Sequence, residues 1–125
     1  MPLLDWDPTD VIECLEVVPE AEEPGIEYGF SCTNDGVRLS LDVWPHESLV
    51  ALSIYREGVE QAIVTFWFYV LDRIRQVKHK SERYLLFERV VLLTGPSPLD
   101  DELKHVEAAL TLRLQAWPRV QVAFV

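Results

Sequence analysis

The segment from Cys32 to Glu47 contains the residue types that nucleophilic catalysis requires. Cys32 could serve as a nucleophile, His46 as its base and Asp42 as the group that orients the base, and Glu47 could line a cleft with them. A hairpin in this segment would place neighbouring strands side by side. Cys32 also continues an apolar alternation, which is typical of a small core residue, and His46 follows a strand end, where exposure is expected. An enzyme or a small-ligand binder using these four residues is therefore an alternative hypothesis.

Other catalytic and cofactor-binding patterns are absent from the sequence. The chain has no G-x-x-x-x-G-K, G-x-G-x-x-G, G-x-S-x-G or H-E-x-x-H pattern. Neighbouring acids at 22–23 and 100–102 lie in an expected loop and an expected helix start, and not in an apolar pocket that would raise a carboxyl pKa. The histidines are far apart and no C-x-x-C occurs, so the sequence predicts no metal site. We therefore expect a non-enzymatic protein without a cofactor.

The negative charge is concentrated at one end of the chain. The formal net charge is −10, and residues 1–35 contain ten acids and no lysine or arginine. The remaining 90 residues contain 11 acids and 11 bases. An anionic segment attracts a cationic protein surface and repels nucleic acid. We therefore expect a partner protein with a basic surface, and no binding to nucleic acid.

The main hypothesis is a protein-binding domain, of which a bacterial immunity or inhibitor protein is one concrete version. The early acids would attract the partner, and a tryptophan at a strand end or near a terminus could anchor it. The candidate binding residues are Trp6, Glu13, Glu16, Glu20, Glu22, Glu23, Trp44 and His46. Trp67 and Trp117 lie in apolar runs and are expected in the core.

Two further features leave alternatives open. The chain could be a structural or assembly subunit, in which an apolar strand over Ile63–Tyr69 forms the interface of a homodimer. Residues 72–83 contain five lysines or arginines with His79 and only two acids. This basic stripe could meet an acidic partner, but a solvated strand whose charges block edge pairing is the favoured interpretation.

The chain shows no pattern typical of membrane insertion or secretion. Its first ten residues carry three aspartates instead of the basic and apolar regions of a signal peptide. The longest apolar stretch, Ala62–Leu71, is about half the length needed to cross a bilayer. Cys14 and Cys32 could form one disulfide, but a chain of this length does not need one. We expect a cytoplasmic protein with reduced thiols and no membrane association.

The first half of the chain predicts a short helix followed by antiparallel strands. Asp7 and Pro8 are a typical helix start, with Val11, Ile12 and Leu15 as the apolar positions. The segment 19–24 is rich in proline and glutamate and predicts a loop. Alternating residues flank Asn34-Asp35-Gly36, which predicts a hairpin, and a third strand is expected over Leu49–Tyr55.

The apolar residues between 59 and 80 fit either one long helix or two strands. Their spacing is compatible with a helix, but the run 63–70 consists of β-branched and aromatic residues, which favour a buried strand. We therefore predict strands through Tyr69, over Arg73–Lys78 and over Tyr84–Leu93, with a turn at 80–82.

The last third predicts a helix and a final strand. Ser97 and Pro98 resemble a helix start, and apolar residues at helical spacing run from Leu99 to Trp117. Val120, Val122 and Phe124 alternate as a closing strand. A strand, helix and strand in this order form a crossover, which would make the strands parallel neighbours.

The predicted fold class is α+β in one domain spanning 1–125. It consists of an acidic N-terminal helix and loop (1–25), an antiparallel β-meander (26–93), and an amphipathic C-terminal helix packed on the sheet with a final strand (98–125). The length is enough to bury one hydrophobic core.

Overall fold

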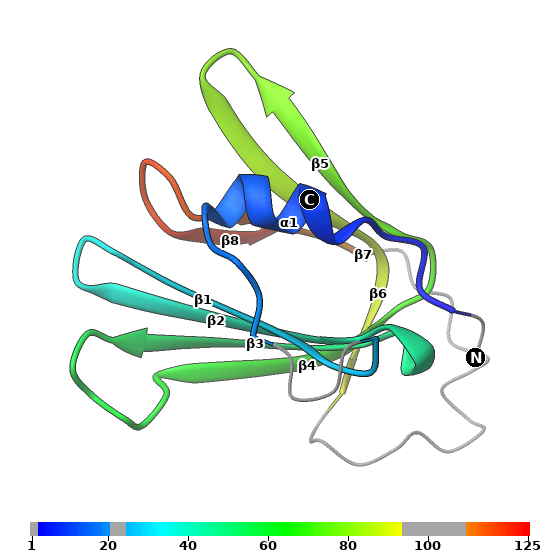
Figure 1. Ribbon diagram of the computed structural model, residues 1–125, viewed down its shortest axis with the longest axis horizontal. Helices are drawn as coiled ribbons and strands as arrows, with labels where there is room; N and C mark the ends of the chain where they lie inside the picture. Colours follow the sequence, from blue (N-terminus) through cyan, green and yellow to red (C-terminus); the bar gives the residue numbers. More distant parts are fainter. Residues whose placement is uncertain (1–2, 21–24, 94–109) are drawn as a thin grey trace.

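One antiparallel sheet dominates the computed structural model, which describes residues 3–20, 25–93 and 110–125. The strand order is β1-β2-β3-β4-β6-β7-β8, and β5 pairs with β6 beside this path. Figure 1 shows the short helix α1 beside the sheet. The elements are α1 (Pro8–Leu15), β1 (Tyr28–Asn34), β2 (Val37–Trp44), the 3-10 turn η1 (Pro45–Glu47), β3 (Leu49–Arg56), β4 (Val64–Val70), β5 (Ile74–His79), β6 (Glu82–Leu93), β7 (Leu110–Gln115) and β8 (Gln121–Phe124).

Helix α1 has a capping residue at each end, Asp7 and Glu16. Asp7 is extended, and its side chain accepts a hydrogen bond of 2.9 Å from the N–H of Thr9, while Pro8 occupies the first turn. The helix ends at Glu16, which adopts the left-handed conformation with φ 59°. The expected N-terminal helix is thus confirmed. Its buried residues are Val11, Cys14 and Leu15.

Replacing Asp7 with alanine is expected to destabilise the protein by about 1 kcal/mol, the usual cost of losing an N-cap. The Thr9 N–H would lose its acceptor, and an isolated eight-residue helix has little stability of its own. Urea unfolding of the two proteins measures the difference. An Asp7→Asn protein is the control, because asparagine caps as well as aspartate; equal losses in both variants would contradict a capping role.

Two tight turns fix the register of the hairpins. Asp35 and Gly36 both have positive φ, 52° and 77°, as the two central residues of a type I′ hairpin turn require. Asn34 therefore pairs with Val37, and the expected hairpin is confirmed. The predicted strands over 49–55, through Tyr69, over 73–78 and over 84–93 are also confirmed, with a turn between β5 and β6 at Lys80 and Ser81.

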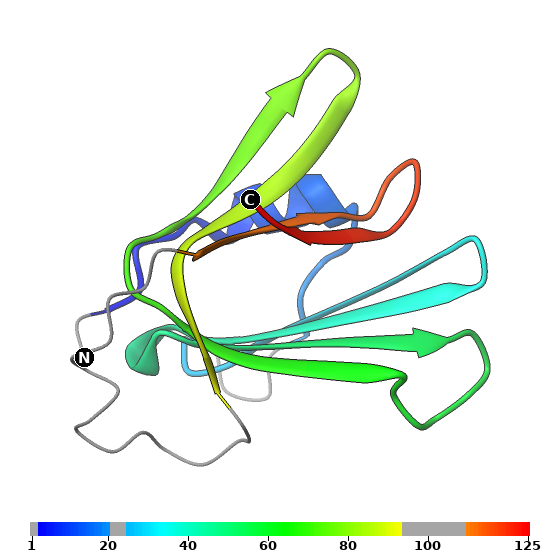
Figure 2. The same ribbon diagram turned by 180° about the vertical axis from the view of Figure 1, so that it is seen from behind.

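Strand β6 joins the two halves of the sheet. Its first part pairs with β5 and its last part, Val90–Leu93, pairs with β4. Between them the register shifts at Glu88 and Val90, and Arg89 has a positive φ of 58°. Such a bulge bends a strand. Figures 1 and 2 show the result, with β1–β4 on one side and the β5–β6 and β7–β8 hairpins on the other.

The hydrophobic core lies between these two halves. Alternate residues of the strands point inward, where α1 also places its apolar side. Phe68 of β4 and Phe87 of β6 meet edge to face, with ring centroids 5.5 Å apart. Asn34 links the end of β1 to the segment after β7, donating to the carbonyls of Ala116 and Pro118. The largest fully buried side chains are Phe30, Phe68, Phe87, Leu15, Leu39, Leu41, Leu52, Leu85, Leu112, Leu114, Val11 and Val43.

The predicted C-terminal helix is wrong where the structure describes it. Residues 110–115 form β7, which pairs with β6 and β8, and the rest of the predicted helix, 98–109, lies outside the described residues. Leu112, Leu114 and Ala116 alternate on the buried side, because pairing with two neighbouring strands outweighs the helix propensity of leucine and alanine.

Two expectations about strand order are also corrected. Strands β1–β4 form a meander, but β4 pairs with β6, and β5 folds back as a hairpin with β6. The final strand over 121–124 is confirmed, but it is antiparallel to β7 and separated from β6 by β7. The expected parallel crossover is therefore wrong.

Candidate protein-binding face

The sheet separates the residues of the possible catalytic set. Cys32 is buried on the inner side of β1 opposite Leu39, whereas Asp42 lies on the other side of β2. His46 and Glu47 are exposed in η1, beyond the end of β2. Burial raises the pKa of the Cys32 thiol, which is the opposite of what a nucleophile needs. The geometry does not assemble the set.

The other cysteine is equally inert. Cys14 is buried on α1, and its burial raises the pKa of the thiol to about 12. Both cysteines are free thiols in the structure, so the disulfide that two cysteines permit is not formed. Within the described residues, no group of three or more His, Cys, Asp or Glu is placed to hold a metal ion.

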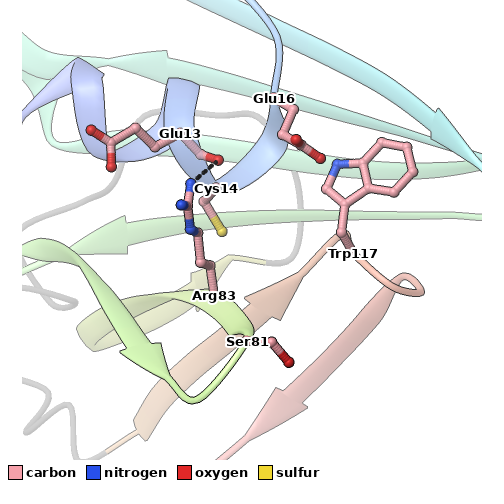
Figure 3. A pocket seen from close by; sticks show the side chains of 6 residues that line it. All are labelled: Glu13, Cys14, Glu16, Ser81, Arg83 and Trp117. Carbon is pink, nitrogen blue, oxygen red and sulfur yellow. Dashed lines mark hydrogen bonds between the residues drawn. The ribbon is translucent and has the colours of Figure 1, made fainter.

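A pocket of about 260 Å³ lies where α1 meets the β5–β6 turn (Figure 3). It is lined by Glu13, Cys14, Glu16, Ser81, Arg83 and Trp117. Arg83 points at the main-chain carbonyl of Glu13 at 3.5 Å, and the indole N–H of Trp117 donates to the carbonyl of Leu15 at 3.2 Å. These polar groups are engaged in attaching the end of α1 to the sheet.

The basic stripe meets acids of the same chain. Arg75 and Arg73 both donate to Glu88, and their hydrogen bonds lower the pKa of that carboxyl. Lys78 lies 3.6 Å from Glu13. Three of the five lysines and arginines of the stripe therefore lie close to an acid of the same chain.

The predicted binding residues do not form one patch. Trp6 packs edge to face on Tyr28 at 5.1 Å and on Phe30 at 6.3 Å, beside the core. Trp44 is at the end of β2 and stacks on Trp67, with centroids 5.7 Å apart and planes 16° apart. Glu13 and Glu16 lie at α1, Glu20 pairs with Gly29 at the edge of β1, and His46 is exposed after β2. Glu22 and Glu23 lie outside the described residues.

The side of β1–β4 that faces away from α1 is called the outer face below. It is set by the register, because the residues that alternate with the buried ones point to it. No described helix packs on it, since the buried residues of α1 belong to the core on the other side. The outer face comprises Gly29, Ser31, Thr33, Arg38, Ser40, Asp42, Trp44, Leu49, Ala51, Ser53, Tyr55, Thr65, Trp67 and Tyr69.

Aromatic groups dominate the middle of the outer face. Ala51 of β3 lies between Asp42 of β2 and Trp67 of β4 in the register of the three strands. Its side chain is small, and Trp67 stacks on Trp44 beside it. The guanidinium of Arg38 lies 3.8 Å from the centre of the Tyr55 ring. Tryptophan, tyrosine and arginine are the residue types that contribute most to protein interfaces.

One edge of the outer face is acidic. Asp42 is half-buried, and burial raises the pKa of its carboxyl, with a further contribution from the negative charge of Glu27. Glu20 lies beside it at the edge of β1, where its main chain exchanges two hydrogen bonds of 2.7 Å with Gly29. Asp42 lies two residues before Trp44 on the same side of β2, so the acidic edge and the aromatic middle belong to one face.

The raised pKa of Asp42 predicts a specific dependence of stability on pH. The folded state favours the protonated carboxyl of Asp42. The stability that this carboxyl contributes is therefore fully present below its unfolded-state pKa and is lost as pH rises through its folded-state pKa. We expect Asp42→Asn to increase the free energy of unfolding at neutral pH. Urea unfolding across the acidic range should show the advantage shrinking as pH falls, and a pH-independent difference would contradict this account.

Sequence reasoning missed part of this face. Trp67, expected in the core, is half-buried on the outer face, and Arg38 and Tyr55 were not singled out. The signal was available in the alternation of Thr65, Trp67 and Tyr69 with Phe66 and Phe68. It is hidden because the run carries large aromatic residues on both sides of the strand.

The comparisons with known proteins give one structural likeness. No protein-family model matches this sequence, and no curated protein matches it. A chain of the contact-dependent growth inhibition toxin–immunity protein complex from Klebsiella pneumoniae 342 has a similar structure, with a TM-score of 0.71 and 12% sequence identity. The match covers 100% of this chain and 98% of that one, so the two share a fold over their whole length. In the described part of this chain, no helix is both long and apolar enough to span a bilayer.

Proposed function

We propose that this chain is a protein-binding domain of the immunity or inhibitor type, which binds a basic partner protein through its outer face. The observation that carries the proposal is the stacked pair Trp44 and Trp67 on a sheet face that α1 does not cover, with Asp42 on the same face and Glu20 at its β1 edge. Aromatic anchors supply contact energy, and surrounding charge selects the partner and speeds association.

Two further observations support it. The net charge of −10 favours a cationic partner, and the acids near α1 are partly offset by Lys78 and Arg83, whereas those near β1 are not paired with a cation among the described residues. The chain of similar structure comes from a toxin–immunity protein complex. Neutralising a basic protein by covering its surface requires no chemistry on the part of the binder.

Affinity capture from lysate of the source organism, at low and high salt, tests the proposal with two matched variants. Glu20→Gln/Glu27→Gln removes two charges beside the outer face, and Glu13→Gln/Glu16→Gln removes two charges at α1. We expect one basic protein to be retained at low salt, weakened by the first pair of changes and little affected by the second. Equal effects of the two pairs, or capture that neither pair alters, would contradict binding at the outer face.

A further inference from the structure

The outer face contains a pocket of about 380 Å³ at its β1 edge. Asp42, Ser40 and Arg38 of β2 line it together with Ser31 and Gly29 of β1 and with Glu20. The lining is rich in hydrogen-bond acceptors, because the Asp42 carboxylate accepts only and the serine hydroxyls accept as well as donate. The pocket is open to the side on which the partner is proposed to lie.

Gly29 is what keeps this pocket open over Asp42. The two residues are directly opposite in the hairpin register. A Cβ atom at position 29 would lie 3.1 Å from Oδ1 of Asp42 and 3.5 Å from the main-chain oxygen of Glu20. A side chain there would crowd the carboxylate, so the absence of one leaves space for another group to approach it.

In the part of the chain that the structure describes, Asp42 has no cation paired with it. No described residue forms a hydrogen bond or ion pair with its carboxylate, and the guanidinium of Arg38, which also lines the pocket, lies over the Tyr55 ring. Glu27 adds like charge. A half-buried carboxylate without a partner is unfavourable in the free protein, and a cation that fills the space would recover that free energy.

We propose that the Asp42 pocket receives a cationic side chain of the partner protein, with arginine favoured over lysine. This inference rests on the proposed function and names the chemistry of one contact within it. A guanidinium has five donors in a planar arrangement, so it can bind the carboxylate and still donate to the hydroxyls of Ser31 and Ser40. A lysine ammonium can satisfy the carboxylate with fewer donors.

Nuclear magnetic resonance titration with a capped arginine tests the pocket without the partner. N-acetyl-arginine methylamide should cause saturable shifts at the amides of Gly29, Ser31 and Asp42, and should lower the pKa of the Asp42 carboxyl. Capped citrulline, which has the same shape without the charge, should cause neither. Asp42→Asn should lower the affinity for capped arginine at least tenfold. Absence of saturation, equal shifts with citrulline, or undiminished binding by Asp42→Asn would each overturn the inference.

Two further measurements separate this inference from the proposed function. Gly29→Ala places a methyl group next to Oδ1 of Asp42 and should weaken the binding of capped arginine. An unchanged affinity would contradict the placement of the bound guanidinium over Gly29. If the partner binds wild type and Asp42→Asn equally, the pocket inference fails and the proposed function stands. If capped arginine binds but neither matched charge pair alters capture of a protein, the proposed function fails and the pocket stands.

Discussion

Replacing Trp44 with alanine is expected to weaken binding of the partner protein by about 30-fold or more, since truncating a central aromatic residue costs about 2 kcal/mol or above. Trp44 is half-buried at the end of β2, and its removal would also take the stacking contact away from Trp67. Titration calorimetry with the captured protein would measure the loss.

The control for this prediction is Phe124→Ala. Phe124 is another accessible aromatic residue, with 44% of its surface exposed, but it lies on β8 at the far end of the strand order. Its replacement should leave the affinity within about twofold, because surface changes outside an interface have small effects. A similar loss in both variants would show that Trp44 acts through general surface apolarity and not through the outer face.

Replacing Phe87 with alanine should lower the free energy of unfolding by about 3–5 kcal/mol, the usual range for a buried phenylalanine. Phe87 is fully buried on β6 and meets Phe68 edge to face, so it joins the two halves of the sheet. A loss of this size is a large part of the roughly 5–15 kcal/mol by which a domain is stable.

Urea unfolding measures this effect, with Phe87→Leu as the comparison. Leucine fills most of the same volume and should cost less than about 1.5 kcal/mol. A loss below about 1 kcal/mol for Phe87→Ala would mean that the halves of the sheet do not pack against each other at this residue.

Local sequence signals predicted the first half of the fold well. The Asp35-Gly36 turn fixes the β1–β2 register, because Asn34 must pair with Val37 and each residue back along β1 then meets the next along β2. That register alone places Gly29 opposite Asp42. The outer-face pocket could therefore have been anticipated from the hairpin, although Val18 and Glu20, which also line the pocket, lie outside the hairpin.

The last third shows why local signals were insufficient. Leu110, Leu114 and Trp117 fit a helical stripe, while Leu110, Leu112 and Leu114 fit an alternating strand equally well. The choice is made by β6 and β8, which offer pairing partners on both sides of β7. Trp67 lies on the outer face and not in the core because its pairing with Ala51 of β3 sets the side of the sheet to which it points.

Hydroxyl-radical oxidation of the four tryptophans, with and without the captured partner, tests the proposed binding face most directly. Trp44 and Trp67 lie on the outer face, while Trp6 and Trp117 pack against the core on the other side. We expect the partner to reduce oxidation of Trp44 and Trp67 at least threefold and to leave Trp6 and Trp117 unchanged. Protection of Trp6 and Trp117 instead would contradict binding of a partner protein at the outer face. So would protection of Trp44 from oxidation when this protein is concentrated without the partner.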